Sequence, residues 1–416
     1  MATSQLKRGG GYAALVLCLL GLCFAGCSGS SSDTNPSFPA DFQQRVAEAF
    51  KTSVSKNGFP GGSLGLMRVG DGASFLNATG MAEALSIADL DQHSWVSKTA
   101  MTADTHSRIA SISKPFTAIM ILMLVDEGIL TLDQTIEDFF PSLVPKSTII
   151  TIRNLLNMTS GLYDHEDYPP LAEETLCGDL TIYYTPEELI AMSNAFGGGK
   201  VLFEPGEWYK YTNTNFTILA MIAQKVTGKT YKELITDLII TRLDLTGTSV
   251  PGDHETTMPS PYTQGYDIPA GKAEGICTEY TSWKDYSIQN MTWDLGAGSI
   301  VSTAEDLLRF MKAIVKGELI SEGLKEQMFT PPKVNVYGLG IPSAYGFGMK
   351  VLENGFTGHD GANFGYNSIM GCWDGYYYAI LVNAGVHVTS GIELKTTQVY
   401  NILLDVREAV SQYVSQ

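Results

Sequence analysis

The segment from Thr117 to Val125 is apolar at almost every position, and this feature restricts the fold of the chain more than any other. A surface helix keeps one polar face, whereas a helix that is apolar all round has to be buried on every side. The chain has 416 residues, of which 44% are hydrophobic and 17% charged, so it can build a large core around such a helix, in one big domain or in two lobes. We therefore expect a buried helix from Ser111 to Glu127, closed by Gly128.

Weaker patterns at both ends of the chain flank a middle part that alternates helical patterns with polar loops. Apolar residues recur at helical spacing in two terminal segments, and three further segments have strand patterns, two of them joined by the turn Gly70-Asp71-Gly72. The predicted elements are helices at 40–55 and 391–414 and strands at 63–69, 74–80 and 376–382. This order predicts a two-lobed α/β protein whose sheet is built from the two termini, with a helical insertion between them.

The N-terminus has the features of a targeting segment. Two basic residues precede an apolar run that is shorter than the ~20 residues a membrane-spanning helix needs. This order predicts a signal peptide over residues 1–26, and Phe24-Ala25-Gly26-Cys27 resembles a bacterial lipobox in which Cys27 receives lipid. Residues 27–38 would form a flexible tether and 39–416 the folded domain of an exported lipoprotein, anchored to a membrane of the cell envelope. Phe24 stands where a lipobox usually has Leu, so plain secretion or an uncleaved anchor are the alternatives.

The charge and the cysteines argue against two classes of partner. The net charge of −17 repels phosphate backbones, so nucleic acid is not expected to bind. The cysteines lack the C-x-x-C spacing of zinc and redox sites, so we do not expect a metal. Cys177 and Cys277 lie in polar, loop-like stretches and could pair outside the cytoplasm, whereas Cys372, in an apolar strand-like run, is predicted to be a buried free thiol.

Ser-x-x-Lys occurs three times, beginning at Ser4, Ser53 and Ser111, although about one chance match is expected in a chain of this length. Only Ser111-Ile112-Ser113-Lys114 opens the predicted buried helix, where residues three apart share a face and the Lys114 amine can approach the Ser111 hydroxyl. Burial penalises the ammonium form, so Lys114 could act as the base that activates Ser111. The alternative is that Ser111 caps the helix and Lys114 is a solvated side chain of its first turn.

Five segments, in order along the chain, resemble motifs of the serine β-lactamase and penicillin-binding protein family. They are Ser111-Ile112-Ser113-Lys114, residues 151–162, Phe203-Glu204-Pro205-Gly206 leading into Tyr211-Thr212-Asn213, residues 296–303, and Gly358-His359-Asp360-Gly361. The resemblance extends from about residue 42 to 410. It implies an α+β fold of the β-lactamase type, in which an antiparallel sheet with flanking helices is built from both termini and a helix-rich lobe is inserted between them. It also implies a serine hydrolase similar to class C β-lactamases and D-alanyl-D-alanine carboxypeptidases, without metal or organic cofactor.

The resemblance assigns a role to each residue of the motifs. Ser111 would be the nucleophile, with Lys114 and Tyr211 moving its proton to the leaving group, and Asn213 would hold the substrate amide. The backbone N–H groups of Ser111 and Ala362 would form the oxyanion hole. Gly361 would keep the strand open, because a side chain there would block a substrate lying along it. Without the family pattern, Tyr211 would be interpreted as an aromatic ring that lines a loop.

His359 and Asp360 determine which reaction of the family is expected. Histidine at 359 resembles the D-alanyl-D-alanine carboxypeptidases and several esterases of the family more than true β-lactamases, and a neutral histidine carries little charge near pH 7. Asp360 departs from the family, which usually has Thr there to receive the substrate carboxylate, and an aspartate would repel that carboxylate. His359 and the predicted place in the cell envelope lead us to expect a carboxypeptidase-like peptidase, whereas Asp360 is the argument for the alternative, an esterase or amidase for non-anionic small substrates. The substrate would be a small molecule or a peptide, such as a peptidoglycan stem peptide, and the protein a monomer.

Two other interpretations compete with this one. Gly61-Gly62-Ser63-Leu64-Gly65 matches the G-x-S-x-G elbow of α/β-hydrolases, for which His359 could serve as the histidine. A strand pattern and a hairpin turn come directly after Ser63, however, so we place Ser63 inside an edge strand instead. The second alternative is a lipoprotein of the cell envelope that keeps the fold as a non-catalytic binding module, although the chemical positions are all occupied by competent residues.

Overall fold

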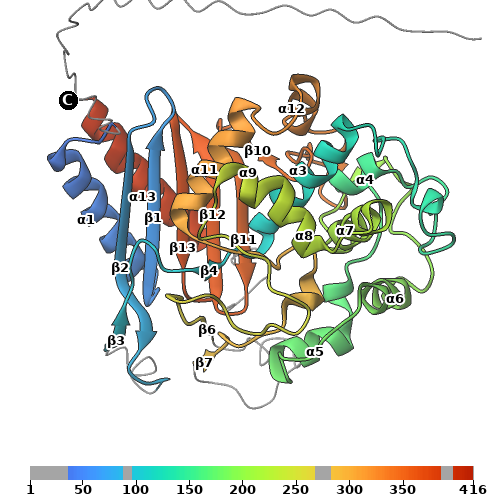
Figure 1. The fold of residues 1–416 in the computed structure, drawn as a ribbon, viewed down its shortest axis with the longest axis horizontal. Helices are drawn as coiled ribbons and strands as arrows, with labels where there is room; N and C mark the ends of the chain where they lie inside the picture. Colours follow the sequence, from blue (N-terminus) through green and yellow to red (C-terminus); the bar gives the residue numbers. More distant parts are fainter. Residues whose placement is uncertain (1–35, 88–95, 268–282, 386–396, 416) are drawn as a thin grey trace, which may run out of the picture. The chain divides into compact units, whose positions relative to one another are not determined.

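An antiparallel sheet forms the centre of the computed structural model, which describes residues 36–87, 96–267, 283–385 and 397–415. In the described residues the sheet has seven strands in the order β10-β11-β12-β13-β1-β2-β3. The strands are β1 (Gly61–Arg68), β2 (Ser74–Ala84), β3 (Ser97–Ala100), β10 (Lys350–Val351), β11 (Thr357–Asn363), β12 (Tyr366–Trp373) and β13 (Tyr376–Val382). Three of them come from the N-terminal part of the chain and four from the C-terminal part, so the prediction of a sheet built from both ends is confirmed (Figure 1).

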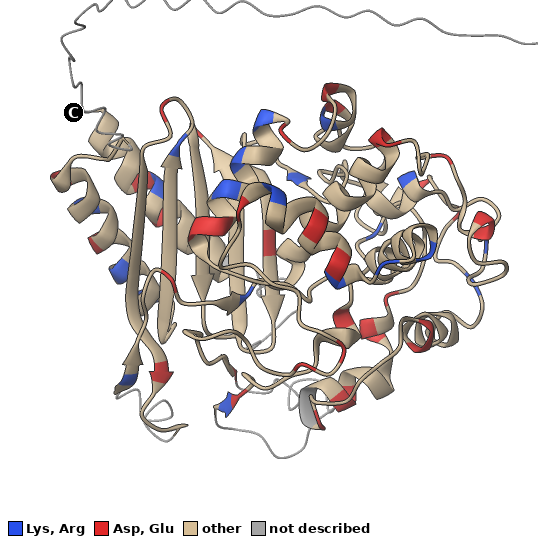
Figure 2. Cartoon of the chain, in the orientation of Figure 1, with Lys and Arg blue, Asp and Glu red and all other residues tan. Residues whose placement is uncertain are grey.

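Helices cover both faces of the sheet. The helix α1 (Ala40–Lys56) packs with α13 (Thr397–Val414) on one face, and α11 (Ala304–Lys316) contacts β1, β12 and β13 on the other. β13 is buried at each of its seven positions, because it lies in the middle of the sheet between β12 and β1. Lys, Arg, Asp and Glu lie mostly on the helices and loops around this layer, and most strand residues are uncharged (Figure 2).

A helical lobe lies beside the β11 side of the sheet and contains most of the middle of the chain (Figure 1). Its helices are α3 (Ser113–Asp126), α4 (Ile152–Leu156), α5 (Pro169–Cys177), α6 (Pro186–Phe196), α7 (Thr214–Thr227), α8 (Tyr231–Ile235), α9 (Thr241–Leu243) and α12 (Glu322–Met328). Short strand pairs brace its loops: β4 (Ser107–Arg108) with β8 (Val301–Ser302), β5 (Trp208–Tyr209) with β9 (Asn335–Val336), and β6 (Tyr266–Asp267) with β7 (Lys284–Asp285). The predicted central helix is α3, which is buried at every position from Ser113 to Leu124.

Three local predictions need correction. Ser111 does not begin the α-helix but lies in a 3₁₀ turn, Ala110–Ile112, because Ala110 has a left-handed backbone with φ of 48° and α3 starts only at Ser113. Ser63 does not lie in an edge strand, since β1 pairs with β13 on one side and with β2 on the other. Cys177 closes helix α5 instead of lying in a loop.

Other predictions fall partly or wholly outside the described residues. Cys27, the signal segment and most of the tether precede residue 36, and Cys277 lies in the gap 268–282, so its pairing with Cys177 stays a prediction. Cys372 is a free thiol on β12, although it is only half-buried. Ser53 is buried within α1 and donates a hydrogen bond to Asp405, 2.6 Å away, which gives it a structural role. Within the described ranges, the helices are all too short or too polar to cross a membrane.

Candidate active site

The 3₁₀ turn that carries Ser111 lies between the sheet and α3. Ser111 is half-buried, and the turn contacts strands β11 and β12. The hydroxyl of Ser113 accepts a hydrogen bond from the backbone N–H of Ile300 at 3.0 Å, and Thr117 donates to the carbonyl of Gly296 at 2.6 Å. These bonds fasten the start of α3 to the glycine-rich turn that the sequence singled out. Non-glycine residues with left-handed backbone cost energy and gather at active sites, which fits Ala110 beside the nucleophile.

Lys114 is fully buried and faces Ser111. Its Nζ lies 3.0 Å from the Ser111 hydroxyl, 2.6 Å from the side-chain oxygen of Asn213 and 3.0 Å from the backbone carbonyl of Ala297. Burial lowers the pKa of Lys114, although the carboxylates of Asp294 and other nearby acids oppose the shift. A lowered pKa makes the neutral amine more accessible than in an exposed lysine, and only the neutral amine can take the proton of Ser111. The solvated first-turn lysine considered as an alternative is excluded.

Tyr211 completes the group of predicted catalytic side chains. The Lys114 ammonium lies 4.8 Å from the centre of its ring, and its hydroxyl hydrogen-bonds to Ser111. Burial, with a smaller contribution from Tyr345, raises the pKa of Tyr211 well above its usual value. The phenol therefore stays protonated at neutral pH, which suits the donation of a proton to a leaving group.

Asn213 precedes α7 and is held at both ends of its amide. Its side-chain oxygen accepts from Lys114, and its backbone N–H and Nδ2 donate to one carboxylate oxygen of Asp164, at 2.9 and 3.1 Å. The second hydrogen on Nδ2 can still reach a substrate, so the predicted contact with a substrate amide stays a prediction. Asp164 was not singled out in the sequence, although it follows the family-like segment 151–162 by two residues.

Asp164 belongs to an acidic group that the sequence patterns did not reveal. Glu166 and Asp294 share a hydrogen bond, and both act electrostatically on Lys114. Burial raises the pKa of Asp294 to about 7 against the opposing charge of Lys114, and burial also raises the pKa of Glu166 well above its usual range. A hydrogen bond between two carboxyl groups requires a proton on one of them, so the pair holds a proton near neutral pH. The one indication of this acidic group in the sequence was that Asp294 lies shortly before the 296–303 motif.

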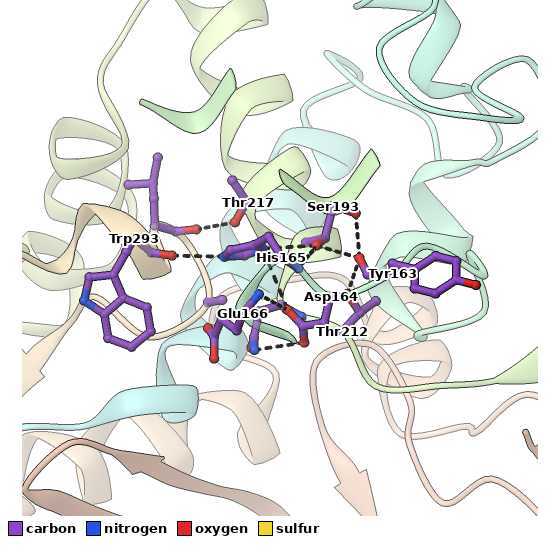
Figure 3. Close-up of polar contacts among 12 residues, drawn as sticks. Tyr163, Asp164, His165, Glu166, Ser193, Thr212, Thr217 and Trp293 are labelled. Carbon is purple, nitrogen blue, oxygen red and sulfur yellow. Dashed lines mark hydrogen bonds and ion pairs between the residues drawn. The ribbon is translucent and has the colours of Figure 1, made fainter. Parts of the chain in front are cut away.

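The same group contains potential metal ligands. One ligand atom each of Asp164, His165 and Glu166 lie within 4.8 Å of one another. Both ring nitrogens of His165 are engaged, however: Nε2 with the carbonyl of Trp293 and Nδ1 with the hydroxyl of Thr214, each at 3.0 Å (Figure 3). An ion would have to displace one of these partners. Burial lowers the pKa of His165, so the ring is neutral and serves to anchor the segment that carries Asp164.

Strand β11 carries His359 and Asp360 along the other side of the site. His359 is 1% exposed; its Nδ1 donates to the backbone carbonyl of Asp360 at 2.5 Å, which leaves Nε2 to accept from the Tyr345 hydroxyl at 3.0 Å. Burial lowers its pKa to about 3, so His359 is neutral. Its ring lies 6.3 Å from that of Tyr211, and contact with a substrate, which stays a prediction, would require it to exchange a partner.

Asp360 forms an ion pair with Lys350 of β10. Burial, the largest single influence, would raise the pKa of Asp360, but the Lys350 ammonium, His359 and hydrogen bonds to the carboxylate together outweigh it and the pKa is lowered, so the carboxylate is ionised at neutral pH. No sequence pattern indicated this pair, because Lys350 lies outside the recognised motifs and the partners are ten residues apart. The positive charge of Lys350 is therefore committed to a neighbour within the protein.

Gly361 and Ala362 lie where β11 passes the nucleophile. A Cβ atom on Gly361 would come within 2.4 Å of the Ile109 carbonyl oxygen and 2.5 Å of the Ser368 hydroxyl. The glycine is thus required for the close approach of β11 to the nucleophile segment, a reason that differs from the predicted need to leave room for substrate. Ala362 is half-exposed beside it, and its N–H as an oxyanion donor remains a prediction.

The structure thus brings the predicted residues Ser111, Lys114, Tyr211, Asn213 and Gly361 to one place. Ser63 is buried in mid-strand, paired with Ala78 and Leu381, so it lacks the strand-to-helix turn of a nucleophile elbow.

Comparisons with known proteins agree with this geometry. Residues 42–396 match the model of the family described as Beta-lactamase. Penicillin-binding protein 4* of Bacillus subtilis is 28% identical over 275 residues, which cover 63% of this chain and 56% of that protein, so the chain spans about half the length of this curated relative. Among solved structures, D-amino acid amidase from Ochrobactrum anthropi SV3 complexed with D-phenylalanine is 27% identical, with a TM-score of 0.74 over 90% of this chain and 100% of that one.

A D-stereospecific amidohydrolase from Streptomyces sp. is similar as well, at 26% identity and a TM-score of 0.68, covering 82% of this chain and 94% of that one. The family model covers most of the chain, and the residues of its motifs meet in one site. The chain therefore belongs to the beta-lactamase family and has the fold of β-lactamases and penicillin-binding proteins.

Proposed function

We propose that this protein is an amidase that transfers the acyl group of an amino-acid amide to Ser111 and then to water. The observation that carries the proposal is the charge around Lys114. Asp294, Glu166, Asp164 and Asp360 all act electrostatically on its ammonium group. Lys350, which could otherwise attract a carboxylate, is paired with Asp360. Negative charge around the site favours a substrate with a free amine over one that ends in a carboxylate.

The chemistry uses the side chains already described. Neutral Lys114 takes the proton of Ser111 while the hydroxyl oxygen attacks the substrate carbonyl. Tyr211, held protonated, donates its proton to the departing amine as the C–N bond breaks, and the proton taken by Lys114 replaces it. Water then attacks the ester on Ser111 by the reverse sequence, releasing the acid and restoring the serine.

The solved relatives support an amide substrate and suggest its stereochemistry. Two of them, which cover 90% and 82% of this chain, are named as a D-amino acid amidase and a D-stereospecific amidohydrolase. We therefore extend the proposal to amides of D-amino acids.

The test compares purified enzyme with a Ser111→Ala variant on D- and L-phenylalanine amide and on an Nα-acyl-D-alanyl-D-alanine peptide. We expect release of ammonia from the D-amide by the native enzyme, slower release from the L-amide, and none from the variant. Turnover of the acyl dipeptide alone would contradict the amidase proposal while keeping Ser111 as the nucleophile.

A substitution at Asp360 tests the charge argument directly. Asp360→Asn removes the partner of Lys350, whose side chain is 30% exposed, and frees its ammonium for a substrate carboxylate. We expect kcat/KM for the acyl dipeptide relative to the amide to rise at least about tenfold, the size of one charge-assisted hydrogen bond. In the double variant that also carries Lys350→Met, the gain should disappear. A ratio that does not change in Asp360→Asn would show that the ion pair does not set the preference.

A D-alanyl-D-alanine carboxypeptidase is the second candidate. It is favoured by the similarity to penicillin-binding protein 4* and by the partial exposure of Lys350, which could leave Asp360 to meet a carboxylate. Intact mass after incubation with benzylpenicillin separates the two functions. A persistent adduct on Ser111, absent from Ser111→Ala, supports the carboxypeptidase, whereas no adduct and no drug hydrolysis supports the amidase.

We also propose that the enzyme acts outside the cytoplasm, anchored by lipid on Cys27. The support is the order of charge, apolar run and Cys27 in the first residues. Expression in a bacterial host should place the native chain in the membrane fraction, and Cys27→Ser should prevent lipid attachment. Unmodified Cys27 in the mass of the native protein would contradict the anchor.

A further inference from the structure

The hydrogen-bond partners of Lys114 determine which way its lone pair points. A neutral amine has two N–H donors and one lone pair. The carbonyl of Ala297, at 3.0 Å, and the side-chain oxygen of Asn213, at 2.6 Å, can only accept, so they take both hydrogens. The third partner is the Ser111 hydroxyl at 3.0 Å, whose O–H can then donate a hydrogen bond to the lone pair. In this arrangement the neutral amine is aimed as a base at the nucleophile.

That arrangement depends on which end of the Asn213 amide faces Lys114. With the amide turned over, Nδ2 would donate to the lone pair, and Lys114 would present a hydrogen to Ser111 instead. Lys114 alone does not prevent this, because its neutral form can accept as well as donate. Asn213 is 8% exposed, so solvent offers little competition for either end.

Asp164 supplies the missing constraint. One of its carboxylate oxygens accepts from both the backbone N–H and the Nδ2 of Asn213, at 2.9 and 3.1 Å. A carboxylate cannot donate, so the oxygen end of the amide has no partner on that side. We propose that Asp164 is a positioning residue, which fixes the amide of Asn213 so that the lone pair of Lys114 faces Ser111. The inference rests on the proposed function, in which Lys114 is the base.

Asp164 is itself firmly held. Its other oxygen accepts the backbone N–H of Glu166 at 3.1 Å and so caps the short turn His165–Asp167. The backbone N–H and the ring of His165 both bind the hydroxyl of Thr214, the first residue of α7 (Figure 3). Asp164 and Asn213 are therefore tied together at two points, which makes the orientation of the amide a property of the fold.

The test measures acylation of Ser111 by p-nitrophenyl acetate between pH 6 and 10. In Asp164→Asn, residue 164 can donate or accept, so the amide of Asn213 can adopt either orientation. We expect the acylation rate to fall about 10²-fold, which is the lower end of the rate enhancement that a positioned general base contributes. The melting temperature should be nearly unchanged. Asp167→Asn, an exposed change in the same turn, should retain the native rate.

A double variant separates positioning from general structure. In Asp164→Asn with Asn213→Asp, residue 213 presents a carboxylate oxygen to Lys114 in either orientation, and the new amide at position 164 can donate to the other oxygen. We expect the acylation rate to be at least tenfold higher than in Asp164→Asn. The pH at which this rate rises should be higher, because a new carboxylate at position 213 adjoins Lys114 in addition to Glu166, Asp294 and neutral His165.

The possible outcomes test the proposed function and the positioning role of Asp164 separately. Native enzyme that is not acylated on Ser111 would overturn the proposed function. Native enzyme that is acylated, with Asp164→Asn equally fast, would overturn only the positioning role. A double variant no faster than Asp164→Asn would do the same, because a merely structural role predicts further loss.

Discussion

At the scale of single residues, the chemistry depends on surroundings that the Ser-x-x-Lys pattern does not contain. The same pattern at Ser53 lies on α1, where the serine hydroxyl donates a hydrogen bond to Asp405. In the sequence, Ser53 is far from the other predicted catalytic residues. At Ser111 the lysine is fully buried, and burial is the largest influence on its pKa. The acids around Lys114 limit that shift, so the pKa reflects a balance between burial and charge.

A change from Lys114 to arginine tests whether this lysine must lose its charge. Arginine keeps the cation and similar reach but is not deprotonated in proteins, so Lys114→Arg should reduce Ser111 acylation at least about 10²-fold. In the native enzyme the rate should rise with pH as Lys114 loses its proton, and the rise should lie below the ordinary lysine value of 10.5, because the pKa is lowered. Stopped-flow acylation from pH 6 to 10 checks both. Substantial acylation by Lys114→Arg would contradict the role of base.

At the scale of elements, strand β11 must pass very close to the nucleophile turn, and Gly361 permits it. Gly361→Ala would place a Cβ 2.4 Å from the Ile109 carbonyl oxygen, so strand or turn has to shift. We expect about 1–3 kcal/mol lower stability, the usual cost of overpacking, and slower acylation of Ser111. Urea unfolding and acylation rates measure the two effects.

The elements themselves were largely predictable from the sequence, whereas their partners were not. The pattern at 376–382 coincides with β13, and that at 40–55 falls within α1, because hydrophobic periodicity reports local structure. That β1 is an internal strand results from its pairing with β13, about 300 residues later, which no local pattern reveals. The 3₁₀ turn at Ser111 was missed because alanine rarely adopts the left-handed backbone seen at Ala110.

The candidate site was predictable where it coincides with motifs and not where it depends on folding. Ser111, Lys114, Tyr211 and Asn213 could be named from their segments. The acidic partners Asp164, Glu166 and Asp294 come from two stretches about 130 residues apart, and only the fold brings them to Lys114. The burial of Glu166 and Asp294, which raises the pKa of both, depends on the packing of whole elements and cannot be inferred from composition.

At the scale of the whole molecule, the buried acidic group lowers the stability of the native state, and the hydrophobic core has to compensate for this loss. Asp294 is 5% exposed, and burial raises its pKa to about 7. A carboxyl group whose pKa is raised by folding stabilises the native state least at high pH, where the unfolded chain ionises freely and the native state is penalised. Active sites often retain such costs because the chemistry needs them. Here the acidic side chains place negative charge around Lys114, the proposed base.

Removing this carboxyl group should therefore stabilise the protein in a pH-dependent way. Native stability from Asp294 is present below about pH 4 and is lost as the pH rises towards 7, whereas Asp294→Asn does not titrate. From pH 5 to pH 8 the free energy of unfolding of the variant should increase by up to about 3 kcal/mol relative to that of the native protein. This is the free energy that corresponds to about two pKa units. Urea unfolding at both pH values measures the gain, with Asp133→Asn, whose side chain is 84% exposed, as the matched control. An equal difference between variant and native protein at pH 5 and 8 would mean that Asp294 ionises normally in the fold. The acylation rate of the same variant should begin to rise at lower pH, because Asp294 no longer holds the proton on Lys114, and this shift would connect the stability cost to the chemistry.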